Sequence, residues 1–196
     1  MTRGLYACAV VLCALPAGAD NALLTPPVVS ALMSIDEVPS KAALDNAFGA
    51  ATALDNLLNV AVDRTVDLGI ELRAIRALPA YCPAPCGLGA AAHDGLTALI
   101  DGFSAAQGTP QDLLRLRAAV EALGATRSAL ATDVDELVPL LDHASRDVRA
   151  TVARALGSLG NSAACAPLKA QDLHEPSLQV ESAIHAAVQA LGRCGN

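Results

Sequence analysis

Apolar residues along most of the chain recur every three or four positions, which is the spacing of one helix face. The longest stripe follows Ser40, a favourable N-cap, and continues to about residue 62. Its apolar members are Leu44, Phe48, Ala51, Leu54, Leu58 and Val62. No segment sustains the alternation of apolar and polar residues that a half-buried strand requires. The pattern predicts an all-α protein.

Helix-capping and helix-breaking residues divide the rest of the chain. Asp63 or Thr65 is expected to cap a second helix that stops at Pro79. Thr109 and Pro110 form an N-cap and first-turn pair, and the helix that they open is expected to end at Gly124. The other helices are expected at about 89–106, 126–131, 134–142, 146–158, 163–170 and 178–192.

Short sequence repeats occur at the ends of several predicted helices. The segment Ala155-Leu-Gly-Ser-Leu-Gly-Asn161 returns as Ala190-Leu-Gly-Arg-Cys-Gly-Asn196, which is an offset of 35 residues. Ala122-Leu-Gly124 is a third copy, and Ala77-Leu-Pro79 resembles a fourth. Units of about 33–45 residues with two helices each are typical of helical solenoids. The repeats therefore predict stacked helix pairs that share one core.

The segment 135–196 resembles HEAT-like repeats, of the short type also found in phycobilisome lyases. The resemblance rests on Glu136-Leu-Val-Pro-Leu-Leu-Asp142, on Ser145-Arg-Asp-Val-Arg149 with its closing Ala155-Leu-Gly157, and on Ala163-Ala-Cys-Ala-Pro-Leu168. The last copy departs from the pattern, because Val180-Glu181 stands where Val-Arg is expected. The resemblance implies a solenoid in the C-terminal half that serves as an interaction scaffold, and it implies no particular chemistry. The N-terminal half is expected to be helical but irregular.

The chain is expected to divide into four parts. These are a signal peptide at 1–19, an irregular segment with proline breaks at 20–39, a helical region with possible degenerate repeats at 40–108, and HEAT-like repeats at 109–196.

The first 19 residues have the composition of a secretory signal peptide. Arg3 precedes the apolar run Leu5–Leu15, and Ala17-Gly-Ala19 fits a cleavage site before Asp20. The run is too short to cross a bilayer, which takes about 20 apolar residues. A buried N-terminal helix is the alternative. We expect an exported protein, periplasmic or extracellular, with no membrane insertion after the signal is removed.

Four cysteines would remain after cleavage, because Cys8 and Cys13 lie within the signal. An even number of cysteines in an oxidising compartment indicates disulfides. We prefer Cys82–Cys86 and Cys165–Cys194 among the three possible pairings. A zinc site is the alternative, but Cys165 and Cys194 are too far apart in sequence to supply the second half of one.

Charge and composition argue against nucleic-acid binding. The formal net charge is −7 and only 2% of residues are aromatic. The chain therefore lacks both the basic surface that binds phosphates and the rings that stack on bases.

Several short motifs resemble chemical sites but are expected to be structural. The segment Gly87-Leu-Gly-Ala-Ala-Ala92 follows no strand, so it is not a dinucleotide site. Glu181 and His185 are expected to form an exposed ion pair, and His174-Glu175 is a lone dyad where HEAT-type di-iron enzymes use several. The remaining polar groups are expected at helix ends or on a solvated face: His93-Asp94, Asp142-His143, Asp133, Asp135 and Glu136.

We therefore expect no catalytic residue, no cofactor site and no metal site. The function predicted is an exported, non-catalytic scaffold of the bacterial cell envelope that binds another protein of unknown identity. One alternative is an enzyme or cofactor-binding protein, lyase-like or metal-assisted, on the same scaffold. Another is a structural component of the envelope.

Overall fold

The computed structural model describes residues 22–33, 37–82, 86–105, 108–192 and 194–195. These residues form helices and connecting turns and contain no strand, so the all-α prediction is confirmed. The expected signal peptide, with Cys8 and Cys13, lies outside the described residues.

Three short helices come first. They are α1 (Pro26–Leu32), α2 (Lys41–Phe48) and α3 (Ala53–Val62). The expectation of an irregular segment at 20–39 is wrong for α1, since Thr25 precedes the helix and Pro26 takes its first position, where a missing N–H costs nothing.

The single helix expected from 41 to 62 is divided in two. Gly49 ends α2 with φ of +86°, a left-handed conformation that glycine adopts without strain. The chain then turns, and the Thr52 hydroxyl donates back to the Phe48 carbonyl at 3.1 Å before α3 begins. The expected apolar stripe holds at Leu44 in α2 but not across this break, because α3 buries Ala53, Leu57, Val60 and Ala61, while Val62 is 55% exposed.

The next elements are α4 (Leu68–Ala77), the 3₁₀ turn η1 (Leu78–Tyr81) and α5 (Ala91–Ala105). The cap of α4 is Asp67 rather than Asp63 or Thr65. Its carboxylate accepts from the backbone N–H of Gly69 at 2.8 Å and of Ile70 at 3.4 Å.

The C-terminal elements are α6 (Pro110–Ala125), α7 (Ala131–Leu137), η2 (Val138–Asp142), α8 (Arg146–Leu159), η3 (Ser162–Ala164), α9 (Cys165–Asp172) and α10 (Leu178–Leu191). Thr109 caps α6 as expected, because its hydroxyl accepts from the Asp112 N–H at 3.1 Å.

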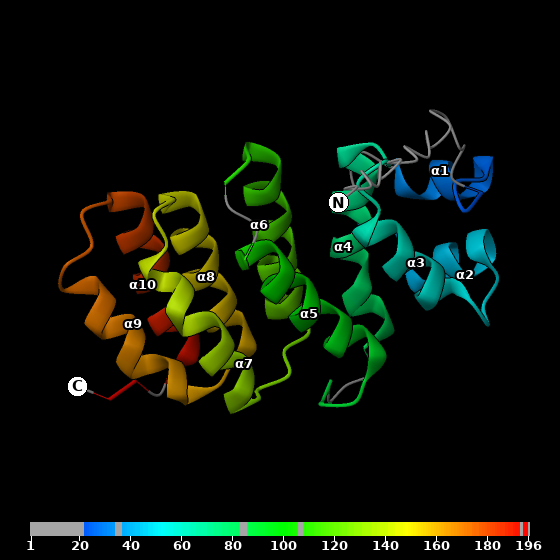
Figure 1. Cartoon of the computed structure of the whole chain (residues 1–196). Coiled ribbons are helices and arrows are strands. Elements are labelled where there is room, and N and C mark those ends of the chain that lie inside the picture. The colour runs from blue at the N-terminus through cyan, green and yellow to red at the C-terminus, as the bar shows by residue number, and fades with distance from the viewer. Residues whose placement is uncertain (1–21, 34–36, 83–85, 106–107, 193, 196) are drawn as a thin grey trace, which may run out of the picture.

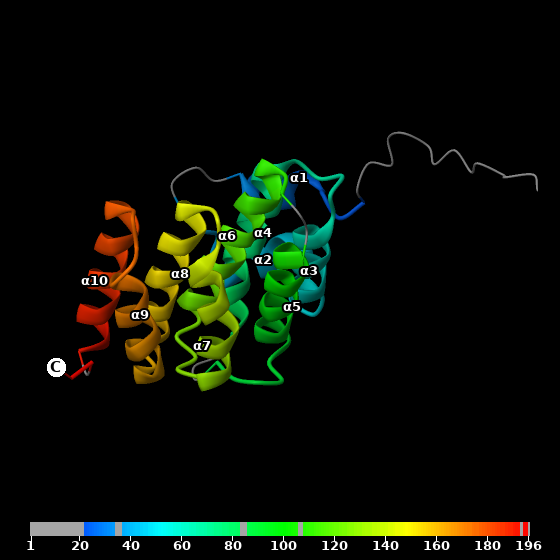
Figure 2. The same cartoon turned by 60° about the vertical axis from the view of Figure 1, so that its left-hand side comes forward.

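The helices stand in two rows. The first row consists of α4, α6, α8 and α10, each of which packs on the next. The second row consists of α3, α5, α7 with η2, and α9, and each of these packs on the first-row helix that follows it in sequence. Figures 1 and 2 show the rows running from the N-terminal to the C-terminal end of the molecule. The stacking therefore extends through the region at 40–108 as far back as α3.

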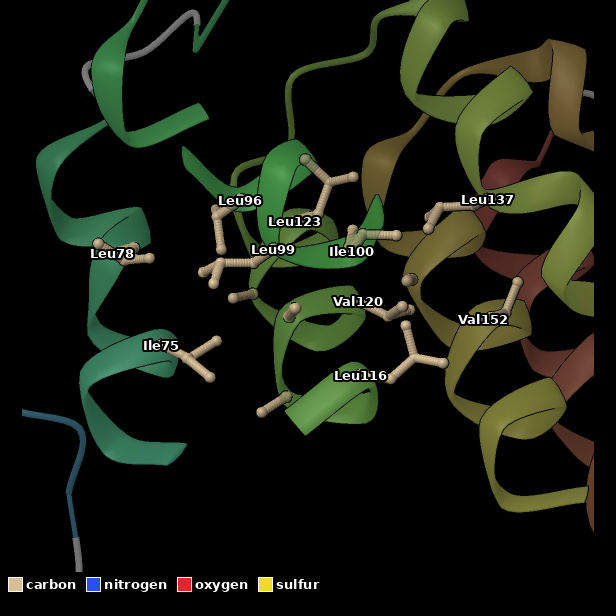
Figure 3. Close-up of a cluster of buried hydrophobic side chains, with 14 of the residues drawn as sticks. Ile75, Leu78, Leu96, Leu99, Ile100, Leu116, Val120, Leu123, Leu137 and Val152 are labelled. Atoms are coloured by element: carbon tan, nitrogen blue, oxygen red, sulfur yellow. The ribbon is translucent and has the colours of Figure 1, made fainter. Parts of the chain in front are cut away.

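The core runs without interruption between the two rows. In Figure 3, Ile75 and Leu78 face the α5 residues Leu96 and Leu99, and the apolar cluster continues through α6 toward α7 and α8. Such continuity explains why one helix pair is not a stable unit, since each pair covers the apolar face of its neighbour.

The structural period of the last two units is 32 residues. Helices α8 and α10 each have 14 residues, and they follow the equivalent N-cap residues Ser145 and Ser177. They end at Gly160 and Gly192, both in the left-handed conformation. The seven-residue sequence match at an offset of 35 is therefore displaced by three residues, almost one helical turn.

Gly124 does not end α6, which continues to Ala125. A Cβ on Gly124 would lie 2.7 Å from the Cα of Ala155 in α8, and a Cβ on Gly157 would lie 2.7 Å from the Cα of Ala187 in α10. The two glycines thus let successive first-row helices approach closely.

Candidate binding groove

A groove crosses the outer face of the first row. Its larger part, about 340 Å³, is lined by Arg76, Arg117, Glu121, Thr151, Arg154, Ala155 and Ser158. A smaller part, about 240 Å³, shares Arg154 and Ser158 and extends to Gly157, Ala186, Ala187 and Ala190. These lining residues define the first-row groove, which touches all four first-row helices.

Small residues make this face hollow. The close approach of Gly157 to Ala187 leaves little side chain between α8 and α10. On α10, Ala186 and Ala190 occupy the positions that Arg154 and Ser158 occupy on α8, 32 residues earlier. The groove is consequently charged toward α6 and α8 and apolar toward α10.

Three arginines dominate the charge of the groove. Arg76 Nε lies 3.0 Å from Glu121 Oε2, and both side chains are solvent-exposed. Arg117 Nη1 lies 3.9 Å from Asp147 Oδ2, while its buried Nε has no hydrogen-bond partner. Arg154 donates to the Thr151 hydroxyl at 3.5 Å and forms no ion pair with a described carboxylate. The guanidinium groups are therefore only partly neutralised within the protein.

A buried ion pair joins α4 to α6. Arg115 Nε donates to Glu71 Oε1 at 2.6 Å, and the Glu71 side chain is fully buried. Asp112 extends the network, since it accepts from Thr109, Arg64 and Arg115. Hydrogen bonds from Thr109 and then Arg64 lower the pKa of Asp112 below its ordinary value. The network therefore holds α4 and α6 against each other.

Glu175 fixes the loop between α9 and α10. Its carboxylate accepts from Arg149 Nε and Nη2 at 2.9 and 2.8 Å, from Gln171 Nε2 at 3.0 Å, and from the Ser177 N–H at 3.0 Å. The Arg149 bonds, above all, lower the pKa of Glu175 to about 2. Glu175 is therefore a structural anion, and the His174-Glu175 pair has no vacant carboxylate for a metal.

A buried histidine joins α5 to α7. His93 Nε2 lies 2.9 Å from Asp133 Oδ1, and His93 Nδ1 lies 3.2 Å from Asp94 Oδ1. Burial opposes protonation of His93, but the two carboxylates outweigh it and raise the pKa of the imidazole above its ordinary value. His93 and Asp133 lie in the first turns of α5 and α7, so His93 is at a helix end as expected. The expectation that Asp133 lies on a solvated face is wrong, because both side chains are only 1% exposed.

Ser128 completes this cluster, but the arrangement is not a catalytic triad. Its hydroxyl donates to Asp133 Oδ2 rather than to His93. A triad needs the serine on the histidine and the carboxylate behind it. Arg127 and Ala129, on either side of Ser128, have φ of +51° and +55°, and Asn161 Nδ2 holds this loop by donating to the Ala129 carbonyl at 2.7 Å.

His185 does not pair with Glu181 as expected. Its Nε2 lies 3.0 Å from Asp172 Oδ2, so the contact joins α10 to α9 rather than two turns of one helix. His143 is at a helix end as expected, where its Nδ1 accepts from the Ser145 N–H at 2.9 Å.

The cysteines lie in the two preferred pairs. The Cα–Cα distance is 5.1 Å for Cys82 and Cys86 and 5.2 Å for Cys165 and Cys194, which suits a disulfide. The second pair joins the start of α9 to the segment after α10. It therefore links the two helices of the last unit.

Other chemistry finds little support in the part of the chain that is described. It contains no cluster of three or more histidine, cysteine or carboxylate side chains able to hold a metal. None of its helices is both long enough and apolar enough to cross a membrane. The segment 87–92 leads into α5, and no strand precedes it among the described residues.

Comparison with known proteins agrees with this geometry. A family model described as HEAT repeats matches residues 103–192, from the end of α5 to the end of α10. No curated protein matches the chain. Residues 103–192 are therefore similar to HEAT repeats, which is consistent with the stacked helix pairs of this region.

Proposed function

We propose that the protein is a non-catalytic scaffold that binds another protein through the first-row groove. The observation that carries this proposal is a groove that crosses four successive helices and is lined by three arginines with little internal pairing. HEAT repeats commonly mediate contacts between proteins, because stacked units offer one extended surface.

The size of the groove suits a segment of polypeptide. Packed helices lie about 9 Å apart, so four of them span roughly 27 Å. An extended chain rises about 3.3 Å per residue, so about eight residues would cross the whole row. A site that is ordered before the ligand arrives binds at a lower entropic cost. The ion pair between Arg115 and Glu71 already fixes helix α4 against helix α6.

We further propose that the protein acts outside the cytoplasm, in the bacterial cell envelope. The signal-like residues 1–19 and the geometry of the two cysteine pairs support this location, because disulfides persist in oxidising compartments. N-terminal sequencing of the protein isolated from its own cells tests export. We expect the chain to begin at Asp20, and a retained Arg3 would contradict the proposal.

Site-specific photocrosslinking in the cells that make the protein tests the binding face. A photoreactive amino acid replaces Ser158 or Ala190 in the groove, and Ala98 or Ala170 on the second row serves as a matched control. All four side chains are exposed. We expect a discrete higher-mass adduct from both groove positions and none from the controls. Adducts from the second row alone, or none from any position, would overturn the proposal.

A further inference from the structure

We propose that the first-row groove binds an extended, acidic segment of the partner protein. This inference rests on the proposed function and adds the chemistry of the partner. The ligand is an extended stretch of main chain that carries aspartate or glutamate side chains toward α6 and α8 and small residues toward α10.

The charge of the groove opposes that of the whole chain. The chain has a formal net charge of −7, yet the groove is lined by three arginines against the single carboxylate of Glu121. A local excess of positive charge attracts a negatively charged ligand to this part of an otherwise acidic surface.

Two of the arginines have donors to spare. Arg117 Nη1 has only a weak contact of 3.9 Å to Asp147, and Arg154 has one long bond to Thr151. A guanidinium group offers parallel N–H donors that a carboxylate accepts as a pair. Each of these arginines can therefore take a carboxylate without first losing a strong internal partner.

The third arginine is paired only at the surface. Arg76 and Glu121 are 37% and 57% exposed, and an ion pair as exposed as this contributes little. Arg76 can exchange Glu121 for a carboxylate of the ligand at little cost. An acidic ligand would thus meet three guanidinium groups contributed by α4, α6 and α8.

The small residues that line the groove favour an extended main chain as the ligand. Ala155, Gly157 and Ala187 bring no long side chain into the groove, and Ala186 and Ala190 leave the α10 end open. Alternate side chains of an extended segment point to the same side, so carboxylates at every second position can face the arginines together. A nucleic acid fits less well, because the groove has no aromatic ring for base stacking.

Peptide binding to the purified protein tests the inference. The probe is a fluorescein-labelled ten-residue peptide of alternating aspartate and glycine, and the matched control has asparagine in place of aspartate. We expect fluorescence anisotropy to show at least about tenfold tighter binding of the aspartate peptide, weakened by added salt. Equal affinity for the two peptides, or equal binding of a single-stranded DNA of the same charge, would overturn the inference.

Charge variants locate the site. Arg117→Gln and Arg154→Gln should each weaken aspartate-peptide binding about tenfold, as expected for the loss of a charge-assisted pair. Arg146→Gln is the control, because Arg146 begins the same helix α8, is 69% exposed and lies outside the groove lining. It should change affinity less than about twofold. An equal loss in Arg146→Gln would show nonspecific attraction and overturn the site.

A charge added at the exposed edge of the groove should change the affinity for the aspartate peptide in a direction set by the sign of that charge. Ala190 is exposed at the α10 end, so Ala190→Lys should tighten binding of the aspartate peptide severalfold, and Ala190→Glu should weaken it. Unchanged affinity in both variants would contradict the inference.

The crosslinking and peptide experiments together distinguish the two proposals. If groove crosslinks form but the aspartate peptide binds no more tightly than the asparagine peptide, the acidic ligand is wrong and the scaffold proposal stands. If the peptide binds but no groove crosslink forms, the scaffold proposal fails.

Discussion

Gly157 of α8 lies directly against Ala187 of α10: a Cβ on Gly157 would stand 2.7 Å from the Ala187 Cα and 2.8 Å from its Cβ. Gly124 stands in the same relation to Ala155 one unit earlier. The neighbouring atoms belong to backbone and to short side chains, which cannot rotate away. Close packing of α6, α8 and α10 therefore depends on these glycines.

Gly157→Ala should lower the free energy of unfolding by about 2 kcal/mol, because the added methyl group forces two packed helices apart. Gly102→Ala in α5 is the matched control, since a Cβ there meets nothing within 4 Å. It should raise stability by about 0.5–1 kcal/mol through its better helix propensity. Urea unfolding of both variants measures this, and equal effects would contradict the close approach.

His93 should make stability depend on pH. The pKa of His93 is raised in the folded protein, so its contribution is complete below the ordinary value of 6.5 and disappears as pH rises through the folded pKa. Melting temperature should therefore fall as pH rises above 6.5, and His93→Gln should flatten this slope. His185→Gln, at an exposed position, should leave it unchanged.

Removing the charge of Glu175 should destabilise the last unit. Glu175→Gln leaves Arg149 without its main partner and should cost about 3 kcal/mol at pH 7. Since the folded pKa is about 2, the contribution is present above pH 4.5 and is lost as pH falls toward 2, so the difference from the unmodified protein should shrink there. Glu181→Gln on α10 is the control and should cost under about 0.5 kcal/mol. A pH-independent difference would refute the assignment.

The two cysteine pairs should contribute unequally. Protein lacking residues 1–19, denatured without reductant, should show no free thiol, and Cys165→Ser should expose one at Cys194. Because this pair is separated by 29 residues, replacing both partners with serine should cost about 3–4 kcal/mol. The Cys82–Cys86 pair encloses a much shorter loop, so its double serine variant should cost less. A titratable thiol in the unreduced protein would contradict both pairings.

Local sequence signals predicted most of the helices and the links between them less well. The helix expected at about 126–131 is wrong, because α6 ends at Ala125, α7 begins at Ala131, and Arg127 and Ala129 between them have positive φ. Thr109 with Pro110 marked the start of α6 because capping depends on neighbouring residues alone. Gly124 and Gly157 end an Ala-Leu-Gly motif that resembles a helix stop, and only the neighbouring helix shows that they serve close packing.

The repeat in the sequence corresponds to a repeat in the structure, but the best sequence match predicts the wrong offset between the last two units. Alanine, leucine and glycine near the ends of α8 and α10 match best at an offset of 35, whereas the caps Ser145 and Ser177 fix the structural offset at 32. Because alanine is abundant, the sequences of α8 and α10 match almost equally well at several offsets. An N-cap residue stands at one position only, so it fixes the offset.

The polar sites depended on distant partners. His93 and Asp133 are 40 residues apart, and Arg149 and Glu175 are 26 apart. No spacing within one helix reveals such contacts. The groove could not be predicted from the sequence either. Its three arginines, Arg76, Arg117 and Arg154, come together only when α4, α6 and α8 stand in one row. The period of the units was the one available signal that these helices share a face.

An experimentally determined crystal structure tests the central claim most directly. It should show α4, α6, α8 and α10 in one row, with Gly124 against Ala155 and Gly157 against Ala187, and with Arg117 and Arg154 lining one groove. A closed bundle in which α6 and α10 pack against each other, or in which those arginines lie on different faces, would contradict the account.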